Sequence, residues 1–430
     1  MRKLSNDLQK RDQGFKGMFR TLFMSPTDYA NEMNRSITNY DPNTIDPFFD
    51  PSRGVFNTIV SGGDTRVRNS AIVAQTANAI HNNFPVIILH EGNSRLARDL
   101  RTNFQRTGHY QEISTGSPAF EPFYKLSALE ITNLIMETAP KDYELKQEAR
   151  YYIDGIAQVI KKSGKNLSFK MFVTCPHALM FDRVTALQQQ STISDAEAQD
   201  ITSRLMIGQL EKLKIESFLS NLKMEIEPFL YQSHCGYKPV NIFSAIKDRQ
   251  ILCFDIASVT NSFLINTLVF QLKLALTRGM PYVLIMDSIP TSGNENLSKF
   301  LMNQSDKIST MLCADDFYSM VGSDEKVFSA LVGNAPNLVI MSHSSNQSAI
   351  KWSEVFGQYD KLEQSFTKQR GGSKRTPFSV LSSPNYSNQV TTSKAREFII
   401  KPEQITRLGQ TEAYILSAAR GEVAHLHIVV

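Results

Sequence analysis

The stretch VFNTIVSGGDTRVRNS, residues 55–70, decides the fold. Its first six residues form a short apolar run that ends at the turn-forming sequence SGGD. A helix is expected to follow from residue 69 to about residue 81, and a second apolar run, PVIILH at 85–90, stops at EGN. A strand, a glycine turn, a helix and a second strand in this order predict a βαβ unit, the building block of a parallel sheet.

The same alternation returns in the second half of the chain. A helix is predicted over residues 262–278, and Gly279 is placed to end it. Around it stand further apolar runs of strand length: ILCFDIA (251–257), YVLIMD (282–287), NLVIMS (337–342), AYILSA (413–418) and VAHLHIVV (423–430). Buried strands that alternate with helices predict an α/β fold with a mainly parallel sheet.

Residues 127–235 follow a helical pattern instead. Ser127 with Glu130, and Ser194 with Glu197, form the Ser-x-x-Glu pattern of a capping box. Behind the second box we expect one long helix whose buried face holds Ile201, Leu205, Leu210, Leu213 and Phe218. The sequence therefore predicts an all-α insert at 127–235 within a sheet domain at 51–126 and 236–430, preceded by a polar arm at 1–50.

The composition is that of a globular protein. Of 430 residues, 41% are hydrophobic and 20% charged, which excludes an intrinsically disordered chain. The 46 basic and 42 acidic residues give a net charge of only +4, so nucleic-acid binding would need a local patch. Four scattered cysteines predict buried thiols in a reducing compartment and no metal site. The absence of a signal peptide and of a long apolar run predicts a cytoplasmic protein without a membrane span.

The turn after the first strand invites comparison with a nucleotide-binding P-loop, GxxxxGK[ST], which has the same strand and helix context. When that pattern starts at Gly63, it ends at Ser70, but Arg68 replaces the second glycine and Asn69 replaces the lysine. A side chain at position 68 obstructs the tight turn, and an amide at 69 brings no charge to a phosphate. The favoured interpretation is a strand–turn–helix corner without nucleotide. The remnant of a nucleotide site comprises Gly62, Gly63, Arg66, Arg68, Asn69 and Ser70.

Two further strand ends match positions that serve catalysis in P-loop enzymes. Asp287 closes the run YVLIMD, as a Walker B aspartate does, but Ser288 follows it where a catalytic glutamate would polarise water. His343 follows the run NLVIMS, where a polar sensor of the γ-phosphate would stand. The alternative interpretation of His343 is a surface histidine at the end of a strand.

In their order, these features resemble the type IV secretion and conjugation coupling proteins, relatives of the FtsK and HerA ring-shaped DNA pumps. The resemblance covers about residues 50–430. It includes the turn LHEGNSR (89–95), the helix end RTNFQRTGH (101–109), the segment FEPFYKLSALE (120–130) and the C-terminal stretch SKAREFIIKPEQITRLGQTEAYIL (393–416). It implies a RecA-like P-loop NTPase fold that carries an all-α insert. The family's N-terminal transmembrane helices have no counterpart here.

One segment is locally basic. Residues 367–401 look like a loop and contain seven lysines or arginines and one acid. The candidates for nucleic-acid contact there are Lys374, Arg375, Lys394 and Arg396. A solvated loop with no DNA contact is the alternative.

The departures from the family fall on the catalytic positions. They favour a coupling-protein-like subunit that has lost ATP turnover and acts as a scaffold or adaptor among the protein partners of a secretion or conjugation apparatus, without a cofactor. One alternative is an active hexameric ATPase that uses Mg-ATP, with Arg66 or Arg68 in place of the lysine. Another is an ATP-independent DNA-binding protein. A mixed ring with a catalytic relative, to which Arg407 or Arg420 would contribute, is also open, as is recruitment to the membrane by a partner.

Overall fold

The computed structural model describes residues 55–139, 143, 145–164, 167–174, 178–233, 236–256, 262–303, 306–371, 385–417 and 423–428. The predicted arm at 1–50 lies outside these residues. Contacts divide the chain into two compact units, one at residues 47–337 and one that includes residues 338–429. The domain boundaries expected from the sequence, 127–235 for the insert and 51–126 with 236–430 for the sheet domain, remain predictions.

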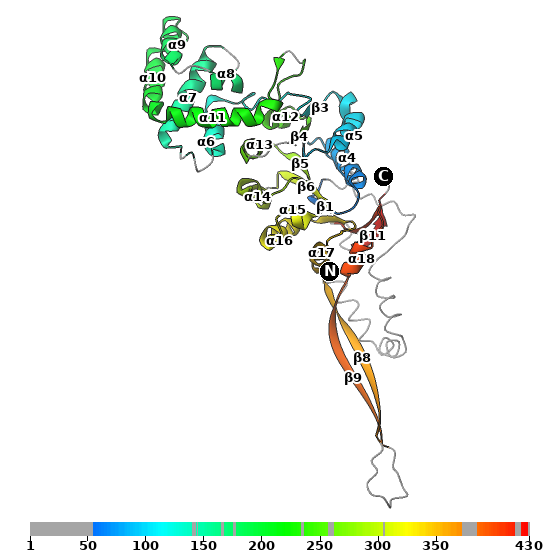
Figure 1. Cartoon of the computed structure of the whole chain (residues 1–430). Coiled ribbons are helices and arrows are strands. Elements are labelled where there is room, and N and C mark those ends of the chain that lie inside the picture. The colour runs from blue at the N-terminus through cyan, green and yellow to red at the C-terminus, as the bar shows by residue number, and fades with distance from the viewer. Residues whose placement is uncertain are drawn as a thin grey trace, which may run out of the picture. The chain divides into compact units, whose positions relative to one another are not determined.

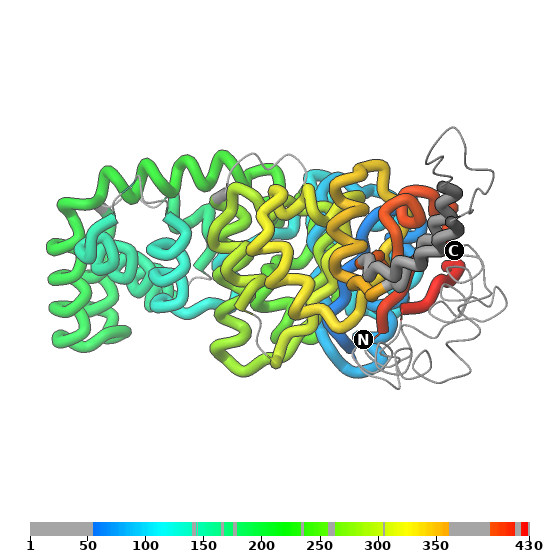
Figure 2. The backbone as a smooth tube through the Cα atoms, turned by 90° about the horizontal axis from the view of Figure 1, so that it is seen from below, coloured from blue at the N-terminus to red at the C-terminus, as the bar shows by residue number. Residues whose placement is uncertain are grey.

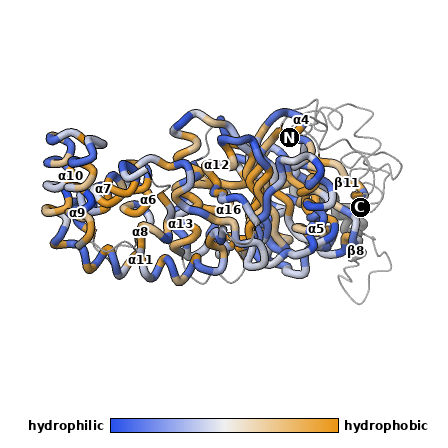
Figure 3. Tube along the Cα trace, turned by 90° about the horizontal axis from the view of Figure 1, so that it is seen from above, coloured by the Kyte–Doolittle hydropathy of each residue, from blue (hydrophilic) through white to orange (hydrophobic). Residues whose placement is uncertain are grey.

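The first unit is built on six strands in the order β1-β6-β5-β2-β4-β3, and every neighbouring pair is parallel. The strands are β1 (Thr58–Ser61), β2 (Val86–His90), β3 (Tyr110–Ile113), β4 (Ile251–Asp255), β5 (Tyr282–Asp287) and β6 (Ile308–Ala314). Helices α4 (Thr65–His81) and α5 (Ser94–Phe104) lie on one side of the sheet, and α13 (Ser262–Thr277), α14 (Glu295–Met302) and α16 (Glu325–Gly333) lie on the other (Figure 1). Their cover explains why the strands are almost entirely apolar, as Figure 3 shows by colour.

The apolar runs predict four of these strands well. β1, β2, β4 and β5 all fall within or next to their predicted ranges, and α13 ends before Gly279, whose φ of +73° suits a helix terminus. The sequence pattern does not predict β6, because Ser309 and Thr310 interrupt its apolar run. Cys253 and Cys313 lie in β4 and β6 as buried free thiols, which confirms that part of the cysteine prediction.

Residues 128–229 of the same unit contain helices and no strand among the described residues. They are α6 (Ala128–Thr138), α7 (Gln147–Lys162), α8 (Phe169–Thr174), α9 (Ala178–Gln189), α10 (Asp195–Gly208), η4 (Gln209–Glu211), α11 (Lys212–Ile226) and η5 (Glu227–Phe229). Figure 2 shows them gathered at one end of the unit. Both predicted capping boxes form, at Ser127 and at Ser194. None of the described helices has the length and apolar composition needed to cross a bilayer.

The long helix predicted after Ser194 is wrong in one respect. A 3₁₀ turn, η4, separates α10 from α11 and changes which residues face the interior. Ile201, Leu205 and Phe218 are buried as predicted, whereas Leu210 and Leu213 are 88% and 78% exposed. The 3.6-residue spacing does not continue through a turn with three residues per turn.

Two glycines allow α10 to pack closely against α7. A Cβ added at Gly208 would lie 2.3 Å from Cβ of Tyr152, and one added at Gly155 would lie 2.9 Å from Cδ2 of Leu205. Tyr152 and Leu205 are both buried. The close packing of α7 against α10 therefore depends on the absence of a side chain at Gly155 and at Gly208.

The second unit contains three paired strands and a long hairpin. β10 (Glu412–Leu416) pairs antiparallel with both β7 (Asn337–Ile340) and β11 (Val423–His427), close to the predicted ranges. Helix α17 (Asn346–Phe356) places Trp352 in the core, fully buried, and α18 (Pro402–Thr406) follows later.

The predicted loop at 367–401 is wrong for most of its length. β8 (Gln358–Gly371) and β9 (Asn385–Phe398) pair antiparallel in continuous register from Gln358 with Phe398 to Gly371 with Asn385 (Figure 1). Within the predicted loop, residues 372–384 lie outside the described chain. The two strands form a sheet of their own, and their largely polar sequences show no alternation that would indicate a strand.

Candidate functional site

The connection between β1 and α4 is only three residues long: Gly62, Gly63 and Asp64. Both glycines have positive φ, 86° and 70°, which a residue with a Cβ adopts at a cost. Helix α4 begins at Thr65, four residues before the predicted start. Arg68, Asn69 and Ser70 therefore lie inside the first two turns of the helix and not in a phosphate-binding loop.

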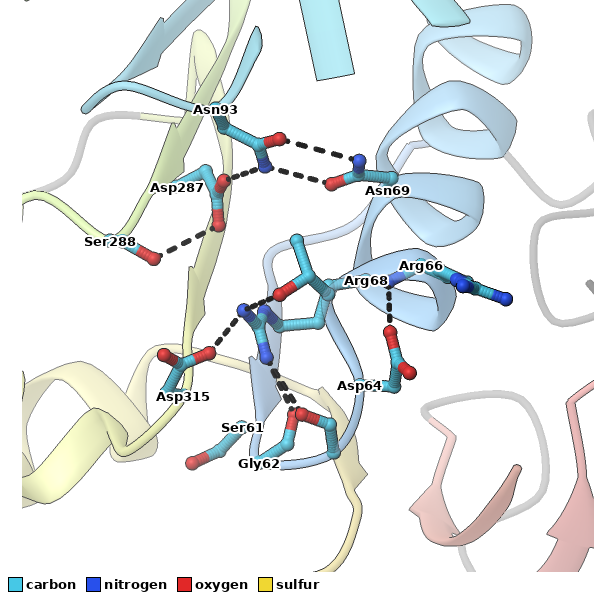
Figure 4. Close-up of polar contacts among 12 residues, drawn as sticks. Ser61, Gly62, Asp64, Arg66, Arg68, Asn69, Asn93, Asp287, Ser288 and Asp315 are labelled. Carbon is cyan, nitrogen blue, oxygen red and sulfur yellow. Dashed lines mark hydrogen bonds and ion pairs between the residues drawn. The ribbon is translucent and has the colours of Figure 1, made fainter. Parts of the chain in front are cut away.

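The amino end of α4 is already capped by an acid. The carboxylate of Asp64 accepts a hydrogen bond from the backbone N–H of Arg66 at 2.7 Å. In a P-loop, this end of the helix offers its N–H groups and its partial positive charge to phosphate. Here a fixed negative charge lies there instead. The exposed Arg66 side chain points away from Arg68 (Figure 4).

Arg68 fills the turn. It is 2% exposed, and its Nη1 donates hydrogen bonds to the carbonyl oxygens of Gly62 at 3.2 Å and Gly63 at 3.0 Å. Its Nη2 donates to Oγ1 of Thr65 at 3.1 Å and forms an ion pair with Asp315 (Figure 4). The glycines thus turn carbonyl oxygens toward a cation that belongs to the protein.

Asp287, at the Walker B position, is also held by hydrogen bonds from neighbouring side chains. Nδ2 of Asn93 donates to Oδ2 of Asp287 at 2.7 Å and to Oδ1 of Asn69 at 2.9 Å. Oγ of Ser288 donates to the other carboxylate oxygen of Asp287 at 3.3 Å. Asn69 and Asp287, both predicted to belong to the remnant of a nucleotide site, are thus linked through Asn93 (Figure 4). Ser70 bonds back to its own helix, at 3.2 Å from the carbonyl oxygen of Arg66.

Sequence reasoning missed Asn93 and His90, which both lie in or beside the quoted turn LHEGNSR. Asn93 caps α5, since its Oδ1 accepts the N–H of Leu96 at 3.0 Å. His90 is fully buried, and its Nδ1 accepts the N–H of Asn93 at 3.2 Å. Burial lowers the pKa of His90 although Asp255 and Asp287 raise it. The position of the turn at the carboxyl ends of parallel strands was the available signal.

His343 belongs to the second unit. It is buried, so the interpretation as a surface histidine is wrong. Its Nδ1 lies 2.8 Å from the carbonyl oxygen of Met341, and its ring lies 6.4 Å from that of Trp352. These contacts are structural, and a sensor role for His343 stays a prediction.

The basic candidates lie on or near the hairpin. Lys394 and Arg396 are in β9, and Arg396 faces Asp360 of β8, with Nε 3.9 Å from Oδ1. Lys374 and Arg375 lie outside the described residues. Their contact with nucleic acid stays a prediction.

The described residues do not fit Mg-ATP. A nucleotide complex needs a P-loop lysine, and here the amide of Asn69 stands in its place. It also needs a Mg²⁺ ion held by a Ser or Thr hydroxyl and by an Asp carboxylate. Here the hydroxyl of Ser70 donates to its own helix, and both carboxylate oxygens of Asp287 already accept hydrogen bonds. The described chain also contains no group of three or more His, Cys, Asp or Glu side chains that could hold a metal ion.

Comparison with known proteins identifies the fold. No protein-family model and no curated protein matches the sequence. Among solved structures, plasmid coupling protein TrwB with a non-hydrolysable GTP analogue matches at a TM-score of 0.50, with 12% identity over 93% of this chain and 92% of that one. Bacterial conjugative coupling protein TrwB in a trigonal form with sulphate matches at 0.50, with 11% identity over 93% and 91%. VirB4 of Thermoanaerobacter pseudethanolicus matches at 0.45, with 10% identity over 87% and 89%.

Proposed function

From its coupling-protein fold, which confirms the predicted α/β class of the P-loop NTPase type, we propose that the chain is a coupling-type subunit without ATP turnover. It would act as a scaffold or adaptor among the proteins of a conjugation or type IV secretion apparatus. The proposal rests on one observation. The guanidinium of Arg68 donates hydrogen bonds to the carbonyl oxygens of Gly62 and Gly63, in the turn that would hold phosphate in a P-loop.

The chemistry supports the loss of turnover. Phosphoryl transfer depends on positioning and on cations that balance the charge of the transferred group. TrwB, with the same fold, binds a nucleotide analogue. In this chain Asp64 puts a negative charge at the amino end of α4, and Ser288 offers no general base beside Asp287. Each missing electrostatic contact of this kind costs about 3 kcal/mol of transition-state stabilisation.

An active ATPase would need Arg68 to leave its position. Its bonds to two carbonyl oxygens, to Thr65 and to Asp315 would all have to break before phosphate could approach the turn. Arg66 is exposed and could supply a charge, but no described contact holds it over the turn. The contacts of Arg68 therefore favour the adaptor over the ATPase.

The first test is nucleotide binding. We expect the purified chain to show no binding heat with Mg-ATP at about millimolar concentration, no phosphate release and an unchanged unfolding temperature, because Arg68 and Asp64 already occupy the site. A ligand at about 100 times its Kd would add about 2.7 kcal/mol of stability, so the thermal measurement is sensitive. Phosphate release that Asp287→Ala abolishes would refute the proposal and support the active enzyme.

DNA binding is the second measurement, because the basic residues of 367–401 favour that alternative. Under the adaptor proposal we expect anisotropy of a labelled DNA duplex to show only weak binding that the variant Lys394→Glu with Arg396→Glu leaves unchanged. Tight binding that falls steeply with salt, with a slope that this double variant reduces by about 2, would establish the DNA-binding function instead.

A further inference from the structure

A cleft of about 770 Å³ lies where residues 128–229 join the sheet of the first unit. Two crossings of the chain hold lining residues Glu121 and Tyr231 in place. Phe120 bonds through its backbone to Phe229 and Tyr231, and the backbone N–H of Glu121 donates to the carbonyl oxygen of Val240 at 2.9 Å. Helix α7 supplies Lys161, and helix α12 (Ile242–Lys247) supplies Phe243 and Lys247. The volume is in the range of pockets that bind ligands.

The charges around the cleft do not balance. Four cations line it, and two of them are paired: Lys125 lies 2.6 Å from Asp248, and Arg278 forms an ion pair with Glu130. Lys161 and Lys247 have no hydrogen-bond or ion-pair partner among the described residues. Two uncompensated positive charges on separate helices therefore face one cleft.

The remaining acid of the lining is Glu121, and it adds little negative charge. Its Oε1 accepts the backbone N–H groups of Phe169 at 2.8 Å and Phe123 at 3.3 Å. Burial nevertheless raises the pKa of Glu121 to about 7. Near neutral pH its carboxyl group is partly protonated, so the cleft keeps its excess of positive charge.

The lining also has an apolar part. Tyr124 and Tyr231 are half-buried and contribute aromatic surface, whereas Phe123 and Phe243 are only 1% and 6% exposed. Aromatic side chains beside unpaired cations are the composition of interfaces that bind a partner through a buried anchor and a charged rim. Lys161 and Lys247 are exposed, so the rim is open to solvent and a ligand bound there keeps one side outside the protein.

We propose that this cleft binds an acidic segment of a partner protein, with an aromatic or aliphatic side chain against Tyr124 and Tyr231 and carboxylates at Lys161 and Lys247. An open rim favours a segment of a larger molecule, because small ligands are usually enclosed on most sides. This inference rests on the adaptor role in taking the ligand to be a protein. Peptide binding is measured without nucleotide, so either proposal can fail while the other holds.

The test uses the full chain and a fluorescein-labelled peptide, Glu-Glu-Phe-Glu-Glu-Phe-Glu-Glu, in an anisotropy titration at low salt. We expect saturable binding, which Lys161→Glu with Lys247→Glu weakens at least about tenfold because two attractive contacts become repulsive. The control is Lys273→Glu with Lys326→Glu, which makes the same change in net charge at exposed lysines outside the cleft. Circular dichroism verifies that both variants are folded.

Three outcomes would overturn the inference. Equal affinity of the two double variants would mean that binding follows net charge and not the cleft. Equal affinity for the peptide with Gln in place of every Glu would remove the acidic preference. Displacement of the peptide by benzoate or inorganic phosphate at the same concentration as the unlabelled peptide would assign the cleft to a small anion.

Discussion

Replacing Gly208 by alanine is expected to lower the free energy of unfolding by about 3 kcal/mol, the upper end of the usual cost of overpacking. The new Cβ would lie 2.3 Å from Cβ and 2.5 Å from the backbone nitrogen of Tyr152. A backbone atom in the middle of α7 cannot move away as the end of a side chain can. Helices α7 and α10 would have to separate, and a shift of the urea midpoint to lower concentration would report it.

Gly333 provides the matched control. It is also the last residue of its helix, α16, but a Cβ there would meet nothing within 4 Å. Alanine at this position is expected to be neutral or to stabilise by up to about 1 kcal/mol through helix propensity. Equal urea midpoints for the two alanine variants would show that the close approach at Tyr152 does not limit stability.

The variant Glu121→Gln is expected to be more stable than the wild type by about 3 kcal/mol at pH 8 and nearly equal to it at pH 4. Burial raises the pKa of Glu121 from 4.5 to about 7. As the pH rises from about 4.5 to about 7, the unfolded chain loses this proton first, and the native state loses stability relative to it. Above pH 7 the loss of folding stability no longer changes with pH, and it amounts to about 1.4 kcal/mol for each unit by which the pKa is raised.

Glutamine removes this penalty because it never ionises, and its side-chain oxygen can still accept the N–H groups of Phe123 and Phe169. Urea unfolding of both proteins at pH 4 and at pH 8 measures the difference. Glu137→Gln, at an exposed position on α6, is the control and should change stability by less than about 0.5 kcal/mol at either pH. A gain for Glu121→Gln that is the same at both pH values would contradict the explanation.

Most of the buried elements could be predicted because each carries its own pattern; β6, whose apolar run is interrupted by Ser309 and Thr310, is an exception among the buried strands. β5 coincides with the run YVLIMD, and the capping boxes at Ser127 and Ser194 start α6 and α10. Elements without an apolar face gave no such pattern. The hairpin β8–β9 is held by main-chain pairing along its length, and main-chain bonds leave no trace in the side-chain sequence.

The sequence predicts the candidate site only as a P-loop pattern in which certain residues are replaced. The sequence shows that Arg68 and Asn69 stand where glycine and lysine are expected, but not where their side chains lie. That depends on the start of α4, which Asp64 fixes at Thr65 as an N-cap. The earlier start places Arg68 a full turn into the helix, from where its side chain returns to the carbonyl oxygens of Gly62 and Gly63. Asn93 reaches Asp287 across 194 positions, a distance that no local pattern encodes.

The pairing of β1 with β6 has a consequence for synthesis on the ribosome. Asn57, next to β1, accepts the backbone N–H of Thr310 in β6 across 253 positions. At about 5–20 residues per second, the ribosome needs about 10–50 seconds to make that length of chain. Throughout that interval the apolar strand β1 has emerged without its parallel neighbour β6, so nascent chains of this protein should depend on chaperones that shield strand edges until residue 314 has left the exit tunnel.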